Sequence, residues 1–159
     1  DSHIEKPVDN RSFVDIENKD LIPFKELINN LDGIMTSHIV FPEVDKDITT
    51  FSKRWVSEIL KEEMEFQGMV FSDDLSMKGT KDYESFYEKT KQAIISGCDM
   101  ILICNNRKGV LDGIRYFEEN QIKPSEKVFS MLMANDISWI NLEKDRRRIA
   151  ISDKLEKLI

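Results

Sequence analysis

The chain has 159 residues, 40% of them hydrophobic and 33% charged, which is typical of a soluble globular domain with a hydrophobic core. Its 30 acidic and 23 basic side chains give a net charge of −7, which argues against nucleic acid or an anionic membrane as the main partner. No apolar run approaches the roughly 18–20 residues that a membrane-spanning helix needs.

Hydrophobic periodicity divides the chain into alternating helices and strands. Apolar residues spaced three and four apart predict helices, and short apolar runs bounded by turn residues predict strands. Thr50 or Ser52 is expected to cap the second helix, which Gly68 ends, and Gly97 is expected to end the third. The predicted elements, in chain order, are an irregular segment (1–20), a helix (21–31), a strand (33–38), a loop (39–47), a helix (52–66), a strand (69–72), a helix (82–96), a strand (100–104), and helices over 108–119, from 124 onward and over 142–158.

This alternation predicts an α/β fold, in which helices wrap a parallel sheet. The strand at residues 100–104 is continuously apolar, as expected of a strand that is covered on both faces. Three strands are few for 159 residues, and the outer ones would leave sheet edges exposed. Because the chain also begins with Asp1 and not with an initiator methionine, we expect it to be a piece of a longer protein.

Two carboxylates, Asp73 and Asp74, directly follow the strand predicted at residues 69–72. Ligands and catalytic groups gather at the carboxyl ends of parallel strands. Burying a carboxylate costs several kcal/mol unless it is paired, hydrogen-bonded or protonated. The pattern alone leaves two interpretations open, a functional acid or a cap of the following turn. We take Asp73 as the candidate functional acid and Asp74 as the loop or cap residue.

The two cysteines, Cys98 and Cys104, lie in apolar surroundings six positions apart. At the two ends of one predicted strand they would be too far apart to form a disulfide. Their number and spacing also argue against a zinc site. Free, buried thiols are typical of a reducing compartment, so we expect a cytoplasmic protein.

Three blocks of sequence resemble family 3 glycoside hydrolases, in particular the bacterial cytosolic β-N-acetylglucosaminidases of peptidoglycan recycling. Residues 66–79 read Phe-Gln-Gly-Met-Val-Phe-Ser-Asp-Asp-Leu-Ser-Met-Lys-Gly, which is similar to the nucleophile motif of that family. Residues 32–42 read Asp-Gly-Ile-Met-Thr-Ser-His-Ile-Val-Phe-Pro, and residues 97–108 read Gly-Cys-Asp-Met-Ile-Leu-Ile-Cys-Asn-Asn-Arg-Lys; both resemble the family in order and interval. The resemblance runs from Asp1 to about residue 115 and implies a TIM-type (β/α)8 barrel.

A TIM barrel needs roughly 250 residues, so the resemblance implies that this chain is the C-terminal part of one. About three parallel strands with flanking helices would be completed by an absent upstream segment. Within this single partial domain, residues 1–20 would form the catalytic loop region, residues 21–120 the last βα units and residues 121–159 the C-terminal helices. The family motif Lys-His-Phe-Pro-Gly-His-Gly, and the upstream Asp and Arg residues that hold the sugar, are absent from the chain.

The resemblance also implies a mechanism. Asp73 would be the nucleophile, His3 the general acid/base, and Asp1 the residue that orients His3, although an N-terminal Ser-His taken alone is more typical of a tag remnant. A histidine suits the double role because its ordinary pKa of about 6.5 lies near working pH. The implied activity is that of a retaining hydrolase that removes terminal β-linked N-acetylglucosamine from peptidoglycan-derived muropeptides through a covalent glycosyl-Asp intermediate. The complete protein would be active and this piece alone inactive.

Other assignments stay open. His38 would either line the sugar site or serve as a hydrogen-bonded structural histidine, and Met77 would pack near the N-acetyl group or inside the protein. No metal or organic cofactor is expected. The expected partners are a saccharide that contains N-acetylglucosamine and the missing N-terminal barrel segment. Two other functions remain open. One is an inactive half-barrel that serves only as a binding or structural module. The other is a phosphorylase of the same family, because a neutral histidine in place of a glutamate tolerates an anionic acceptor better.

Overall fold

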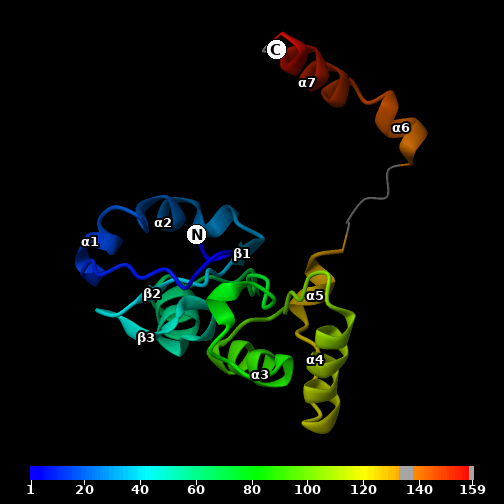
Figure 1. Ribbon diagram of the computed structural model, residues 1–159. Coiled ribbons are helices and arrows are strands. Elements are labelled where there is room, and N and C mark those ends of the chain that lie inside the picture. Colours follow the sequence, from blue (N-terminus) through cyan, green and yellow to red (C-terminus); the bar gives the residue numbers. More distant parts are fainter. Residues whose placement is uncertain (133–137, 158–159) are drawn as a thin grey trace.

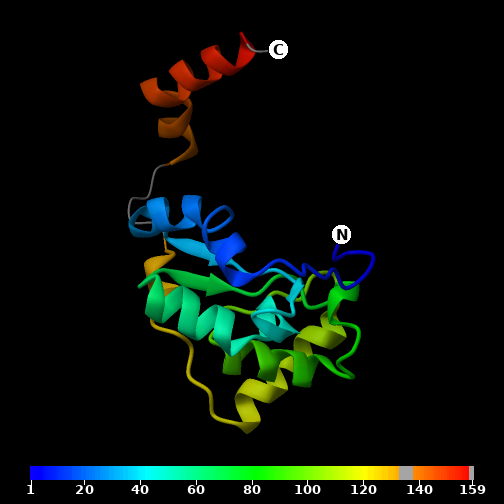
Figure 2. The same cartoon turned by 90° about the vertical axis from the view of Figure 1, so that its left-hand side faces the viewer.

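The structure, a computed structural model, describes residues 1–132 and 138–157 (Figure 1). Its central feature is a parallel pair of strands, β1 (Gly33–Met35) and β4 (Met69–Phe71), which lie side by side in Figure 2. A further parallel bridge joins Phe71 to Met100. The predicted α/β class with parallel strands is confirmed.

The two strands differ in burial and in pairing. Met69 and Val70 of β4 are fully buried, whereas Met35 at the end of β1 is 57% exposed. Within the part of the chain that the structure describes, β4 covers one edge of β1 and no strand covers the other. An uncovered edge presents unpaired N–H and C=O groups that readily accept another strand.

The strand predicted over residues 100–104 is wrong beyond Met100. The segment does run alongside the residues that follow β4, but side chains replace part of the expected backbone ladder. The amide of Leu102 donates to Ser72 Oγ at 2.9 Å, and the amide of Cys104 donates to Asp74 Oδ1 at 2.9 Å. The apolar run is therefore an extended segment that the polar residues after β4 hold in place.

The three predicted helices around the strands are present. The first of these, η3 (Arg54–Glu63), has π-helical geometry, and Ser52 Oγ accepts the amide of Trp55 at its start. Thr50, the other predicted cap, has a different role that is described below. The other two helices are α3 (Phe86–Ser96), which Gly97 ends in the left-handed conformation (φ 115°) as predicted, and α4 (Arg107–Glu119).

Two regions expected to be irregular contain regular structure. The helix α1 (Phe13–Glu17) forms within the first 20 residues because Ser12 caps its first turn through a side-chain hydrogen bond. The loop expected over residues 39–47 contains an antiparallel pair, β2 (Val40–Phe41) and β3 (Asp45–Ile48). Neither strand is long enough to show a clear alternation of apolar and polar residues, so the sequence pattern missed both.

The C-terminal helix predicted over residues 142–158 is two helices in the described residues, α6 (Trp139–Glu143) and α7 (Arg146–Glu156). They separate because Asp145 accepts the first amides of α7 and starts a new helix. The predicted end at position 158 lies outside the described residues. Figure 1 shows α6 and α7 apart from the other elements. The remaining elements are α2 (Ile22–Leu27), η1 (Ile28–Asn30), η2 (Thr49–Phe51), η4 (Lys78–Thr80) and α5 (Lys127–Ser130), which starts after the predicted residue 124.

The hydrophobic core lies between the strands and helices η2, η3 and α3. Both cysteines are free thiols, as predicted, but only Cys98 is buried, and burial raises its pKa to about 11. Cys104 is exposed, so its predicted burial is wrong, because the residues around it form an extended segment and not a central strand. No helix within residues 1–132 or 138–157 is both long and apolar enough to cross a bilayer.

Thr90 on α3 is fully buried, and its hydroxyl has no hydrogen-bond partner among the described residues. A buried hydroxyl without a partner is destabilising. We expect Thr90→Val, which replaces the hydroxyl by a methyl group of similar size, to raise the free energy of unfolding by about 1 kcal/mol. Urea unfolding of the folded protein measures the change, and a loss of stability would contradict this account of the Thr90 hydroxyl.

Candidate active site

The turn that follows β4 carries the two predicted carboxylates. Asp74 is committed to holding this turn, since its carboxylate accepts the amides of Ser76 and Cys104, both at 2.9 Å, and the Ser76 hydroxyl at 2.6 Å. Burial alone would raise the pKa of Asp74, but these hydrogen bonds outweigh it and hold the pKa below its ordinary value. The geometry agrees with the prediction that Asp74 is a turn residue.

Asp73 is half-buried and makes fewer contacts. Its carboxylate accepts the amide of Asp74 at 2.8 Å, and its own amide donates to the Oγ1 of Thr36 at 3.2 Å. Thr36 lies directly after β1, so the neighbouring strand supports the Asp73 backbone. Asp73 therefore has a fixed backbone and a carboxylate with capacity for further partners.

The first residues of the chain form a carboxylate–imidazole pair. Asp1 Oδ1 accepts the backbone amide of His3 at 2.9 Å and lies 2.8 Å from His3 Nδ1. The His3 side chain is 75% exposed. With Nδ1 turned to the carboxylate, Nε2 is the ring nitrogen left to exchange a proton with another molecule.

The loop that carries Asp1 and His3 is attached to the segment after Asp73. The Gly79 amide donates to the Ser2 carbonyl at 3.0 Å, and Lys6 forms an ion pair with Asp82. Gly79 also packs against His38, where a built Cβ would lie 2.7 Å from the Cβ of His38. The described residues include no hydrogen bond or ion pair between His3 and Asp73, so the structure joins their loops without joining the side chains.

His38 is fully buried in this structure and is hydrogen-bonded at both ring nitrogens. Nε2 lies 2.9 Å from the Asp74 carbonyl oxygen, and Nδ1 lies 2.9 Å from Thr50 Oγ1. Burial lowers the pKa of His38, although the Asp74 carbonyl and the nearby carboxylates oppose that shift. These contacts support the structural alternative for His38. Sequence reasoning gave no site role to Thr36 or Thr50, because a threonine at the end of a predicted strand or at a helix cap carries no sign of a functional contact.

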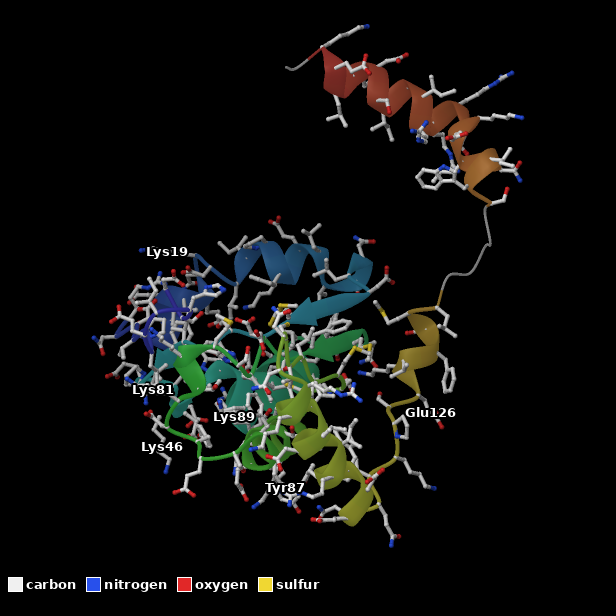
Figure 3. The ribbon with its side chains drawn as sticks, turned by 45° about the vertical axis from the view of Figure 1, so that its right-hand side comes forward. Lys19, Lys46, Lys81, Tyr87, Lys89 and Glu126 are labelled. Carbon is white, nitrogen blue, oxygen red and sulfur yellow. The ribbon has the colours of Figure 1, made fainter. Side chains whose placement is uncertain are left out.

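The turn has a second buried support on its other side. Lys89 on α3, labelled in Figure 3, donates from Nζ to the Leu75 carbonyl at 2.9 Å, and Thr80 Oγ1 donates to the same oxygen at 2.8 Å. Burial lowers the pKa of Lys89. Met77, the other sugar-contact candidate, is only 9% exposed, which supports its alternative role in packing.

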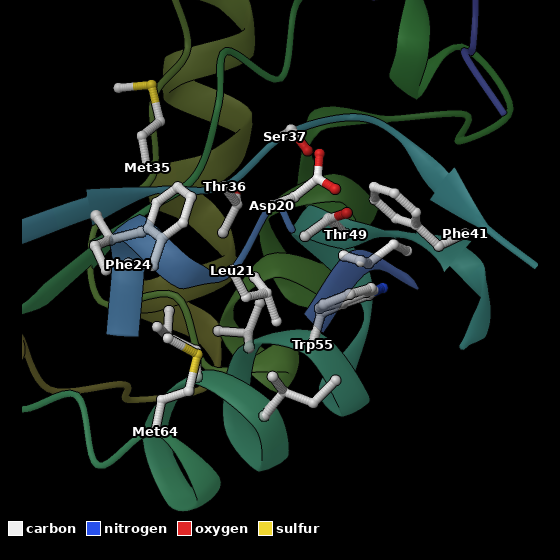
Figure 4. Close-up of a pocket in the computed structure, with 15 residues that line it drawn as sticks. Asp20, Leu21, Phe24, Met35, Thr36, Ser37, Phe41, Thr49, Trp55 and Met64 are labelled. Atoms are coloured by element: carbon white, nitrogen blue, oxygen red, sulfur yellow. The ribbon is translucent and has the colours of Figure 1, made fainter. Parts of the chain in front are cut away.

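The described residues contain an apolar hollow of about 270 Å³ at a different place from the two carboxylates. Figure 4 shows apolar side chains from α2, β1 and η3 around it, and neither His3 nor Asp73 lines it. Within residues 1–132 and 138–157, no group of three or more His, Cys, Asp or Glu side chains is placed to hold a metal ion. The side chains on these two loops that can take part in chemistry are the Asp73 carboxylate and the Asp1–His3 pair.

Comparison with known proteins places these residues in a family. The protein-family model described as "Glycosyl hydrolase family 3 N terminal domain" matches residues 1–132 of this chain. The chain belongs to glycosyl hydrolase family 3. The match spans the Asp1–His3 loop, both strands of the parallel pair and the turn with Asp73 and Asp74.

Members of family 3 with known names are similar over most of this chain. A protein of Tolumonas auensis named "Beta-hexosaminidase" is 41% identical over 152 residues, 92% of this chain and 44% of its own length. One of the same name from Haemophilus influenzae is 40% identical over 155 residues, again 92% and 44%. The crystal structure of NagZ from Neisseria gonorrhoeae in complex with N-trifluoroacetyl-D-glucosamine superimposes with a TM-score of 0.72 at 27% identity, covering 91% of this chain and 41% of that one. The chain thus spans less than half the length of these relatives.

Proposed function

We propose that this chain carries the nucleophile and the general acid/base of a retaining β-N-acetylhexosaminidase. The observation that supports this most is that one hydrogen bond, from Gly79 to Ser2, joins the loop of the Asp1–His3 pair to the segment that follows Asp73. Relatives named "Beta-hexosaminidase" at about two-fifths identity support the activity. The resemblance of the sequence motifs further supports N-acetylglucosaminides derived from muropeptides as the substrates. It also supports the cytoplasm as the compartment in which the reaction takes place.

The proposed reaction has two steps, each with a proton transfer at His3. In the first, a carboxylate oxygen of Asp73 attacks the anomeric carbon, the glycosidic bond breaks, and the Nε2 proton of His3 passes to the leaving oxygen. In the second, a water oxygen attacks the same carbon, the bond to Asp73 breaks, and His3 Nε2 takes the water proton. Asp1 holds the imidazole through Nδ1 and stabilises its charged form.

The rest of the sugar site is proposed to come from residues beyond these 159. The uncovered edge of β1 and the exposure of Met35 support the view that a further strand pairs there. Positioning of bound substrate supplies on the order of 7–11 kcal/mol of the barrier in well-oriented reactions. We therefore expect the 159-residue chain alone to have no hexosaminidase activity.

A chimera tests this proposal, with residues 1–159 in place of the matching region of the Tolumonas auensis relative. A 5-fluoro N-acetylglucosaminyl fluoride should label the chimera, because the fluorine slows hydrolysis of the covalent intermediate. Peptide mass spectrometry should find the sugar on Asp73. The 159-residue chain without the added part is the matched control and should not be labelled. Label on another residue, or an active chimera that never labels, would contradict the assignment of Asp73. Release of N-acetylglucosamine 1-phosphate when phosphate is present would instead reveal a phosphorylase.

A further inference from the structure

We propose that Thr36, Thr50 and His38 form a one-directional hydrogen-bond relay that positions Asp73 by holding both ends of the Asp73–Asp74 dipeptide. The inference rests on the proposed function, since it assigns positioning residues to the nucleophile of that reaction. None of the three side chains is expected to touch the sugar, because Thr36 is 8% exposed and Thr50 and His38 are fully buried.

The relay starts at the Asp73 amide, which donates to Thr36 Oγ1 at 3.2 Å. Thr36 Oγ1 lies 2.9 Å from Thr50 Oγ1, which lies 2.9 Å from His38 Nδ1. On the other side of the ring, His38 Nε2 lies 2.9 Å from the Asp74 carbonyl oxygen. The path therefore begins at the N–H of the dipeptide and returns to its C=O.

The direction of each hydrogen bond follows from the groups at the two ends. The Asp74 carbonyl can only accept, so His38 Nε2 must carry a proton, and a neutral ring then has an unprotonated Nδ1 that accepts from the Thr50 hydroxyl. Burial, which lowers the pKa of His38, favours the neutral ring. The Thr50 hydroxyl also lies 2.9 Å from the Ser37 carbonyl, but that oxygen already accepts the Thr50 amide at 3.1 Å. Directing the hydroxyl to His38 therefore leaves no carbonyl without a donor.

The Thr36 hydroxyl completes the hydrogen-bond path. Because Thr50 donates to the histidine, its oxygen accepts from the Thr36 hydroxyl, and Thr36 in turn accepts the Asp73 amide. With the Thr50 hydroxyl directed to His38, each donor meets one acceptor within the path, and all links point from the Asp73 amide to the Asp74 carbonyl. Such a closed path restricts the rotation of the dipeptide backbone, and this restriction fixes the direction in which the Asp73 carboxylate leaves the turn.

Thr50→Val tests the relay in the chimera described above, because it removes the central hydroxyl with little change in volume. We expect kcat to fall about 10- to 100-fold with KM changed less than about threefold, since the nucleophile and not the sugar contacts is displaced. Thr50→Ser, which restores the hydroxyl, should recover kcat to within about threefold of the unmodified protein. Thr36→Val breaks the preceding link and should repeat the pattern.

Thr90→Val is the matched control. It makes the same chemical change at another fully buried threonine, whose hydroxyl has no partner in the described part of the chain. We expect its kcat and KM to equal those of the unmodified chimera. Equal effects of Thr50→Val and Thr90→Val on kcat would overturn the relay, as would a Thr50→Ser variant no better than the valine variant.

A second measurement does not depend on activity. Nitrogen-15 NMR of the histidine rings, assigned by the signal lost in His38→Gln, should show a protonated Nε2 and an unprotonated Nδ1 at neutral pH. In Thr50→Val the Nδ1 signal should move toward the value of a nitrogen without a hydrogen-bond donor. A protonated Nδ1 would overturn the relay even in an active enzyme. If the histidine signals are as expected but the fluorinated sugar never labels the chimera, the relay stands and the proposed function is contradicted.

Discussion

Asp73→Ala in the complete chimera is expected to lower kcat on an aryl N-acetyl-β-glucosaminide by at least about 10³-fold, because the covalent step loses its nucleophile. The variant should regain turnover when azide is added to a substrate with a dinitrophenyl leaving group. Azide would then occupy the space of the missing carboxylate and attack from the α face, so the product should be an α-glycosyl azide. The configuration of that product, read by proton NMR, reports the face on which Asp73 acts.

Asp74→Asn is the control for Asp73. An asparagine can keep the acceptor for the amides of Ser76 and Cys104, so kcat should stay within about tenfold of the unmodified chimera. The main effect of Asp74→Asn should be a lower free energy of unfolding. Because the folded pKa of Asp74 lies below its unfolded value of about 3.9, the carboxylate stabilises the fold above that pH. The stability lost in Asp74→Asn should therefore be largest above about pH 4 and shrink as the pH falls through the folded pKa. Comparable losses of kcat from Asp73→Ala and Asp74→Asn would mean that the wrong carboxylate has been assigned.

His3→Ala should be the second severe change, and its severity should depend on the leaving group. With a sugar leaving group, loss of proton donation should lower the rate about 10²- to 10⁴-fold. A dinitrophenolate leaves without a proton, so the first step should then be affected far less. Azide needs no deprotonation, and it should attack the glycosyl-Asp73 intermediate to give a β-glycosyl azide, opposite in configuration to the product of Asp73→Ala.

Asp1→Asn should follow the same pattern more weakly, because the Asp1 carboxylate contacts His3 at Nδ1 and at the His3 backbone amide, and not at the Nε2 that exchanges the proton. An equal loss on good and poor leaving groups in His3→Ala, without a β-azide product, would remove His3 from the mechanism. The Asp1–His3 pair would then be an exposed loop interaction, and another group would have to donate the proton.

The sequence predicted the parts of the site that depend on local pattern. The run before Asp73 is apolar and ends at a turn, so both the strand and the placement of two carboxylates at its end were foreseeable. Gly97 could be recognised because a glycine after a helical run is a frequent helix end. The irregular pairing of the segment at 100–104 could not be predicted, because the side chains of Ser72 and Asp74 accept two of its amides and no periodicity encodes such contacts.

The relay was hidden for a related reason. Thr36 and Thr50 are 14 positions apart and meet only because Thr36 follows β1 and Thr50 lies in η2. As a sequence feature, Thr50 was indistinguishable from a helix cap, and in the structure it is the Ser52 hydroxyl that accepts an amide near the start of η3. His38 presented two interpretations for the same reason, since a histidine after a strand gives no sign of whether its ring faces solvent or neighbouring polar groups.

Gly79 has a consequence for how this site can vary. Its backbone amide donates to the loop of the acid/base candidate, and its missing side chain leaves room for the Cβ of His38, the residue that supports the nucleophile candidate. A methyl group at this position would lie 2.7 Å from the Cβ of His38. Either His38 or the Gly79 backbone that donates to Ser2 would then have to shift, so a side chain here would disturb one of the two loops. Directed evolution of the chimera toward new sugars should therefore find that position 79 stays glycine while the exposed residues around it change.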